Sequence, residues 1–364
     1  RYYKFGETKI NRKLMIMTIV TIQLPEVKST EESRPTKCPY CPGKIFQRWG
    51  KRQKRVKDPY IQEVIIYRYR CCQCHRTFRH YPEGISHAQQ TERMKVLAAI
   101  GWRLGLSYRG IALLYGVFQT RISRMTAWRD VQERAARLRK SWYGKTTRVV
   151  GVDGAYVLGP TGTEPILVMV DMGTGEPIAL GHIDEKDPQA VEDFLAPLVQ
   201  EYGISVIVTD GLKSYKTVSN NLELEHQECQ FHLRRWVNRS LKDYEKSLDE
   251  EYQAMVEEVY QIIDELPPEG DKRLLALYSQ LPKFDQWKKG RTMSPLQRFR
   301  LLLIRLSENW QRFCVFQWHE KVPWTNNLSE QCICKLKMRS RTVRGYKSTS
   351  GMLNGLMVAG SLVS

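Results

Sequence analysis

The sequence predicts an α/β protein in which two small modules precede an α/β domain and an all-helical segment interrupts that domain. Three observations support this fold class. Paired cysteines occur before residue 75, and β-branched runs separated by glycine turns fill residues 148–228. Apolar residues at spacings of three and four then dominate residues 233–320. With 364 residues, the chain is long enough for two or three domains.

Positive charge is concentrated in the first two fifths of the chain. Residues 1–147 contain 31 Lys and Arg against 10 Asp and Glu, whereas residues 148–364 contain 26 against 29. A basic surface can serve solubility alone, but this uneven distribution favours a module that binds a polyanion, with nucleic acid as the leading partner. No apolar stretch approaches the ~18–20 residues that span a bilayer. Because the nine cysteines do not form a disulfide pattern, we expect a cytoplasmic protein.

The first two segments are an N-terminal segment, residues 1–36, and a cysteine-rich module, residues 37–90. Lys13–Gln23 is expected to form one strand. Two Cys-x2-Cys pairs present four thiolates with the spacing of a zinc ribbon, which binds one structural Zn²⁺. The expected ligands are Cys38, Cys41, Cys71 and Cys74. Cys72 or His75 remains an alternative for one of them.

Between the cysteine pairs lies a basic stretch beside Trp49 that we expect to bind phosphates. The alternative is a solvated hairpin tip. The predicted DNA contacts in this stretch are Lys51, Arg52, Lys54 and Arg55.

Helical periodicity begins at Thr91 and defines a third segment, residues 91–145. Ser107–Gly116 followed by Val117–Arg129 has the pattern of a helix-turn-helix, in which the second helix meets base edges in the major groove. An ordinary three-helix bundle has the same periodicity. The predicted probing residues are Gln119, Thr120, Arg121, Ser123 and Arg124.

The α/β domain begins with residues 146–232. Its predicted strands are Val149–Leu158, Pro165–Asp171, Pro177–Ile183, Ile204–Thr209 and Leu222–Glu228, with a helix from Asp187-Pro188 to Tyr202 and a short helix after Gly211. Three antiparallel strands, a helix, a parallel strand, a helix and a further strand are the order of the ribonuclease H (RNase H) fold. This order places the ends of the first and fourth strands side by side.

The remaining chain contains a helical insertion, residues 233–322, and a last part of the α/β domain, residues 323–364. Trp287, Trp310 and Trp318 are expected to pack in the core of the insertion. The last part begins with Pro323–Glu330, in which Asn327 is the expected N-cap of a helix. Its basic stripe is expected to hold DNA and contains Lys335, Lys337, Arg339, Arg341 and Arg344.

Three acidic residues are expected to share one site: Asp153, Asp210 and Glu330. Cleavage or transfer of a phosphodiester needs an activated oxygen nucleophile and neutralisation of charge on phosphorus, and two Mg²⁺ ions supply both. Taken singly, Asp153 could lie in a turn, Asp210 could cap a helix, and Glu330 could belong to a capping box. Carboxylates that could replace one of the three are Asp171, Asp184, Asp187 and Asp193.

The contexts Gly151-Val-Asp153-Gly, Val208-Thr-Asp210-Gly and Thr325-Asn-Asn-x-x-Glu330 resemble those of DDE transposases from bacterial and archaeal insertion sequences, of the retroviral-integrase superfamily. The resemblance covers about residues 148–350. The motif Cys229-x2-His232 is similar to one in mutator-like transposases and implies that both residues lie near the active site. The role of His232 stays open between a contact to the substrate and packing of its helix.

The resemblance implies a DNA transposase of a prokaryotic cell that acts with two Mg²⁺ or Mn²⁺ ions. It would bind the terminal inverted repeats of its element, cleave each end to free a 3′-hydroxyl, and transfer that hydroxyl to target DNA. A homodimer or larger assembly on DNA is expected. The alternatives are a domesticated sequence-specific DNA-binding protein, and an RNase H-like nuclease.

Overall fold

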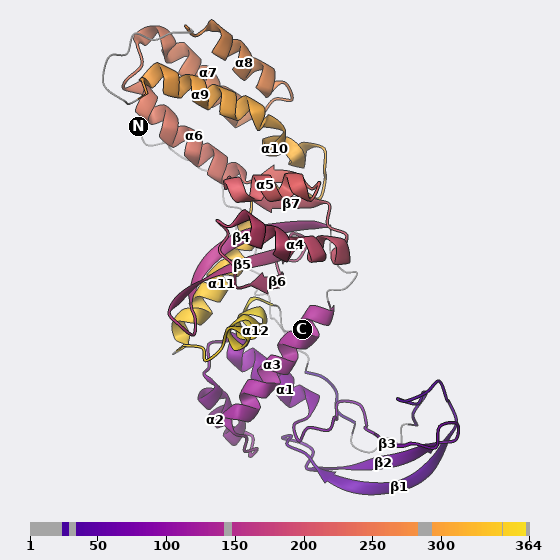
Figure 1. Cartoon of the computed structure of the whole chain (residues 1–364). Helices are drawn as coiled ribbons and strands as arrows, with labels where there is room; N and C mark the ends of the chain where they lie inside the picture. The colour runs from indigo at the N-terminus through magenta and orange to yellow at the C-terminus, as the bar shows by residue number, and fades with distance from the viewer. Residues whose placement is uncertain (1–23, 29–33, 142–147, 283–292, 344, 362–364) are drawn as a thin grey trace, which may run out of the picture.

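The computed structural model describes residues 24–28, 34–141, 148–282, 293–343 and 345–361. The predicted strand Lys13–Gln23, Trp287 and Arg344 lie outside these residues. Figure 1 shows an elongated molecule with a small antiparallel sheet at one end, a bundle of helices at the other, and a larger sheet between them. No helix in the described ranges is long and apolar enough to cross a membrane.

The small sheet has three antiparallel strands in the order β1 (Phe46–Arg55), β2 (Glu63–Cys71) and β3 (Thr77–His80). Alternate residues of β2, including Val64 and Ile66, are buried in a minor core. Most of β1 is exposed on both faces. The basic stretch, for which a solvated hairpin tip was the alternative, forms the second half of the strand β1.

Three helices follow: α1 (Glu92–Arg103), α2 (Tyr108–Val117) and α3 (Arg124–Ser141). The predicted second helix begins later than expected, because residues 118–123 form the turn. Gln119 has a φ of 55°, outside the helical region, and the hydroxyl of Ser123 accepts a hydrogen bond from the backbone N–H group of the third residue after it.

The larger sheet contains β4 (Val149–Leu158), β5 (Thr163–Asp171), β6 (Pro177–Gly181), β7 (Val206–Thr209) and β8 (Glu225–Glu228). Its spatial order is β6-β5-β4-β7-β8. The first three strands are antiparallel, whereas β7 is parallel to β4 and β8 is parallel to β7. The register pairs Gly151 of β4 with Val208 of β7.

Helices cover both faces of this sheet (Figure 1). The even-numbered residues Val150 and Val152 of β4 pack on one face with α4 (Pro188–Tyr202) and α5 (Lys213–Asn221). The opposite face, which includes Ala155, Val157 and Val168, packs on two C-terminal helices. These helices are α11 (Asn327–Thr342) and α12 (Thr349–Gly360).

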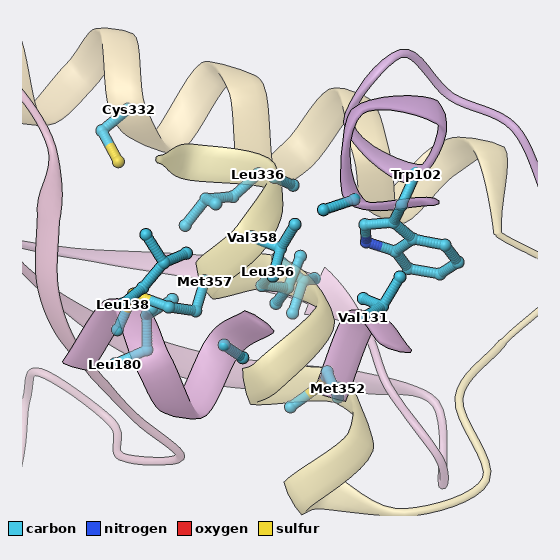
Figure 2. Close-up of a cluster of buried hydrophobic side chains, with 14 of the residues drawn as sticks. Trp102, Val131, Leu138, Leu180, Cys332, Leu336, Met352, Leu356, Met357 and Val358 are labelled. Atoms are coloured by element: carbon cyan, nitrogen blue, oxygen red, sulfur yellow. The ribbon is translucent and has the colours of Figure 1, made fainter. Parts of the chain in front are cut away.

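The core on the second face continues into the three N-terminal helices. Figure 2 shows Trp102 of α1 and Val131 of α3 beside Met352 and Leu356 of α12. The indole nitrogen of Trp102 donates a hydrogen bond to the carbonyl of Gly355 at 2.8 Å. The boundary predicted at residue 145 therefore does not separate two hydrophobic cores.

The helical segment has a core of its own. Its helices are α6 (Gln230–Glu245), α7 (Gln253–Glu265), α8 (Gly270–Gln280), α9 (Pro295–Glu308) and α10 (Trp310–Cys314), with short 3₁₀ helices at Glu250–Tyr252 and Val315–Gln317. Trp310 is buried as predicted. Trp318 is 54% exposed, so its prediction as a core residue was wrong.

Candidate active site

Asp153 and Asp210 follow from the register and alternation of two neighbouring strands. Val149 of β4 and Val208 of β7 pack in one cluster, on the face opposite to Val150. Since side chains alternate along a strand, Asp153 faces the same way as Val149. Gly151 of β4 pairs with Val208 of β7, and each is followed two residues later by an aspartate, Asp153 and Asp210. The two carboxylates are therefore placed side by side at the carboxyl edge of the sheet, where β7 ends beside the middle of β4.

Glu330 reaches this edge from the first turn of α11. The helix approaches β4 closely because residue 151 is glycine: a Cβ atom at Gly151 would lie 2.0 Å from the Ser329 hydroxyl oxygen and 2.7 Å from the Asn326 side-chain oxygen. Asn326 itself is buried, and its side-chain amide donates a long hydrogen bond, 3.5 Å, to the carbonyl of Val152. The N-cap is Asn326, not the predicted Asn327, and its side chain makes no capping hydrogen bond.

Repulsion among buried carboxylates shapes the electrostatics. Burial, together with the carboxylates of Asp210, Glu185 and Glu330, raises the pKa of Asp153 to about 7. Burial also raises the pKa of Asp210, although one of its oxygens accepts a hydrogen bond from the backbone N–H group of Leu212 at 3.1 Å. Burial and carboxylate repulsion both disfavour the ionised form of Asp153, and a bound cation would relieve both effects.

Glu185 is a fourth carboxylate that the sequence analysis missed. It lies in the loop after β6, accepts a hydrogen bond from the Tyr215 hydroxyl at 2.8 Å, and its pKa is raised by burial and by the charge of Asp210. A Cβ atom at Gly154 would lie 2.3 Å from its carboxylate, so the second glycine of the Gly-x-Asp-Gly motif gives it room. Gly154 was the one feature of the sequence that could have indicated a side chain packed against this point of β4.

The four carboxylates named above as possible replacements have other contacts. Asp171 accepts a hydrogen bond from Thr174, and Asp184 accepts one from the backbone N–H group of Lys186. Asp187 is the N-cap of α4, and Asp193 accepts a hydrogen bond from the side chain of Gln189. The carboxylates that raise the pKa of Asp153 are those of Asp210, Glu185 and Glu330 instead.

Cys229 and His232 adjoin the carboxylates through the first turn of α6. The Cys229 thiol is buried and accepts a hydrogen bond from the backbone N–H group of Asn326 at 3.3 Å. His232 is 36% exposed, and its Nε2 atom lies 3.8 Å from Oε1 of Glu330. Contact with the Cys229 thiol, with help from Glu330 and Asp210, raises the pKa of His232. Cys229 thus joins α6 to the segment before α11, whereas His232 is open to a substrate.

Replacing Asp153 by Asn is expected to stabilise the Mg²⁺-free, zinc-loaded protein at neutral pH. Because the folded pKa is raised to about 7 from an ordinary value of 3.8, the folded state binds this proton more tightly than the unfolded state does. Stability is therefore lost as pH rises from the lower value to the higher, by about 1.4 kcal/mol for each pH unit crossed. The difference in Tm between Asp153→Asn and wild type should be clearly smaller at pH 5 than at pH 8. Equal differences in Tm at the two pH values would contradict a raised pKa of Asp153.

Replacing Gly151 by Ala is expected to displace the start of α11 and with it Glu330. The new methyl group would overlap Ser329 and Asn326, and overpacking of this kind costs about 1–3 kcal/mol. Thermal unfolding measures the loss. Gly116→Ala in α2 is the matched control, because a Cβ atom there has nothing within 4 Å. A Gly151→Ala variant as stable as the control would show that the close approach of α11 does not matter.

The predicted zinc ligands come together. The sulfur atoms of Cys38, Cys41, Cys71 and Cys74 all lie within 4.8 Å of one another. Backbone N–H groups of Tyr40 and Gly43 approach two of these sulfur atoms at 3.4 Å, and hydrogen bonds from the backbone of Cys74 and Gln73 contribute to a pKa of about 7 for Cys71. Cys72 is exposed and outside the cluster. Four sulfur atoms gathered within 4.8 Å of one another fit a divalent soft cation.

Most of the predicted DNA-contacting residues in the described ranges are solvent-accessible. The exposed ones are Lys51, Arg52, Arg55, Gln119, Arg121, Ser123, Arg124, Lys335 and Arg341, and Lys337 is half-buried.

Three predicted contacts have structural partners instead. The ammonium of Lys54 donates to the carbonyls of Ser86 and Ala88. The hydroxyl of Thr120 is buried and donates within the turn after α2. The Arg339 guanidinium is buried over the Trp102 ring, 3.6 Å from its centroid, and donates to two backbone carbonyls between α1 and α2. These three side chains hold elements together, so only the exposed residues remain predicted DNA contacts.

Comparison with known proteins identifies the family. No curated protein matches the chain. The model of the transposase IS66 family matches residues 168–354, which is slightly more than half of the chain. The matched segment runs from β5 into α12 and includes Asp210 and Glu330, whereas Asp153 precedes it. The chain therefore belongs to the transposase IS66 family.

Proposed function

We propose that the protein is a Mg²⁺-dependent DNA transposase whose active site consists of Asp153, Asp210 and Glu330. The convergence of these three carboxylates at one edge of the sheet carries the proposal. The strand order β6-β5-β4-β7-β8 with β7 and β8 parallel to β4 supports an RNase H-like fold, and membership of a transposase family supports the reaction class.

The donor set fits hard divalent cations. Carboxylate oxygens are the ligands that Mg²⁺ prefers, and the raised pKa of Asp153 indicates that these acids lack sufficient counter-charge from the described side chains. Asp153 would contact two ions, with Asp210 and Glu330 each completing one of the two. Bound there, such ions would activate the attacking oxygen and neutralise the charge that develops on the phosphate.

The protein's own residues have distinct tasks in this proposal. Cys229 holds the segment before α11 through Asn326, so it positions Glu330. His232 carries a raised pKa and lies beside Glu330, so its protonated ring can donate to a phosphate oxygen of the scissile strand. The glycine at 151 lets α11 approach the sheet.

The N-terminal part supplies DNA binding in the proposal. One zinc ion in the cysteine cluster would make residues 37–90 a zinc ribbon, and α1, α2 and α3 would present the exposed turn 118–123 and the start of α3 to the terminal inverted repeats. Arg121 and Arg124 are exposed there. Two element ends must be processed together, so the active form would be a homodimer or larger assembly on DNA.

Cleavage of a labelled duplex that carries the end of the protein's own element tests the proposal. We expect strand nicking that leaves a 3′-hydroxyl in Mg²⁺ or Mn²⁺ and none without an added divalent cation. The protein should be zinc-loaded and free of chelator, since a chelator would also remove zinc from the cysteines. Specific binding without nicking in either metal would instead indicate a DNA-binding protein without transposition activity. Nicking at any sequence would indicate a simple nuclease.

A further inference from the structure

A cavity of about 950 Å³ opens beside the carboxylates. Asp210 and His232 are among the residues that line it, and its other walls come largely from α5, α6, α9 and α10. It lies at the upper end of the ~300–1,000 Å³ of pockets that hold small organic molecules. The predicted site accounts for only three of the lining residues, Asp210, Cys229 and His232, and the helical segment provides much of the remaining wall.

Positive charge lines the rest of this cavity. Five cationic side chains surround it, from α5, α6 and α9: Lys213, Lys216, Arg235, Arg239 and Arg305. Lys216 is paired with Glu228 at 3.0 Å. Within the described part of the chain the other four form no salt bridge and are exposed. Four cations without acidic partners, gathered around one concavity, favour a polyanionic ligand.

One face of α6 arranges these groups in a row. His232, Arg235, Trp236 and Arg239 are spaced three and four residues apart, so they lie on the same side of the helix. The row begins at Glu330 and extends roughly 10 Å along α6, more than the ~3.4 Å that one strand of B-DNA advances per nucleotide. The row therefore leads away from the carboxylates over more than one nucleotide.

Trp236 determines which form of polyanion fits. Trp236 lines the cavity, stands between Arg235 and Arg239 in the sequence of α6, and is 39% exposed. Bases in a duplex are already stacked on their neighbours, so an indole inside a pocket can stack only on a base that has left the duplex. Cations that follow a strand, interleaved with an aromatic platform, are the usual means of binding single-stranded nucleic acid.

We propose that this cavity binds unpaired nucleotides of the DNA strand next to the scissile phosphate, with Trp236 stacking on a base. Arg235, Arg239 and Arg305 bind the flanking phosphates. This inference rests on the proposed function, because it takes the carboxylates as the place of cleavage. It adds that the DNA end is opened locally when it reaches the active site and that the helical segment supplies part of the strand-binding surface.

Photocrosslinking to single-stranded DNA tests the proposal. The probe is a 20-nucleotide oligothymidylate that carries one 5-iodouracil, bound to the full-length, zinc-loaded protein with Ca²⁺ in place of Mg²⁺. Excess unlabelled duplex occupies the N-terminal modules. We expect mass spectrometry to find the crosslink at Trp236, and a duplex probe to give much less of it. Crosslinks confined to residues 38–141, or equal crosslinking by duplex, would overturn the proposal.

Affinity for the same probe provides the second readout. Trp236→Ala should weaken binding about 5- to 100-fold, as expected for the loss of one stacked base, and Trp236→Phe should restore most of it. Trp318→Ala is the matched control, because this exposed tryptophan is not in the cavity wall. Affinity of Trp236→Ala equal to that of the control would overturn the proposal.

Charge reversal completes the test. Arg239→Glu should weaken binding and reduce its salt dependence more than Lys242→Glu does, because Lys242 is exposed on α6 but outside the cavity. Equal effects would show that only the general charge of α6 matters. None of these measurements requires cleavage. A crosslink at Trp236 would therefore stand even if Asp153→Asn left nicking unchanged, and a protein that cleaves DNA without this crosslink would retain the proposed function alone.

Discussion

Replacing any of the three acids by its amide is expected to abolish nicking of the element end while DNA binding survives. The variants are Asp153→Asn, Asp210→Asn and Glu330→Gln. Each removes one charge from a site where burial and mutual repulsion indicate that cations are needed. We expect a loss of at least about 10²–10³-fold in the rate of nicking, the effect of removing one preorganised electrostatic group.

Asp193→Asn is the matched control for these variants. This residue lies on α4 and its side chain accepts a hydrogen bond from Gln189, at 3.0 Å. Nicking should therefore continue at the wild-type rate. If one of the three amide variants also nicks at that rate, the acid concerned is not a metal ligand, and Glu185 becomes the leading replacement because it repels Asp153 directly.

Replacing Cys38 or Cys74 by Ser is expected to remove zinc and unfold the small sheet. The two sulfur atoms lie 3.8 Å apart, so each is needed to complete a set of four ligands. Binding of a structural zinc contributes about 10–16 kcal/mol in small domains, far more than the minor core of β2 can replace. Mass spectrometry under native conditions should find one zinc per wild-type chain and none in the variants.

The same variants should lose affinity for the element end and become sensitive to protease within residues 37–90. Cys72→Ser is the control, since Cys72 is exposed and outside the cluster. If Cys72→Ser loses zinc and Cys74→Ser retains it, the ligand set predicted from the spacing is wrong.

Local patterns in the sequence were sufficient to predict several helices and strands. The helix predicted from Asp187-Pro188 to Tyr202 is α4, because the Asp187 side chain accepts from two backbone N–H groups and Gly203 ends the helix with a φ of 63°. Asp153 and Asp210 were predicted from the strand order to share a site, but the predicted meeting of two strand ends was wrong: Asp153 lies in the middle of β4 and adjoins Asp210 because the shorter strand β7 ends beside that point. Each of these predictions depends on neighbours in sequence or on the order of strands.

Other features depend on contacts that no local pattern contains. Glu185 lies in a loop, and only the packing against Gly154 and Tyr215 brings it to the carboxylates. Arg339 belongs to a basic stripe in the sequence, yet its guanidinium is buried over Trp102, more than 200 residues earlier in the chain. The later start of α3 has a local cause, because backbone hydrogen bonds around Gln119 form a turn there that the helical periodicity did not reveal.

The shared core of α1, α3 and α12 has a consequence for synthesis on the ribosome. Trp102 needs the backbone of Gly355, and Gln132 accepts a hydrogen bond from Asn354, a residue 222 positions later. Contacts of such high sequence separation form late, and domains fold as their residues emerge from the ribosome. A nascent chain that has not yet released α12 therefore lacks part of the core beneath its first three helices. The surface proposed to read DNA is completed only when the last of the three acids, Glu330, has already been made.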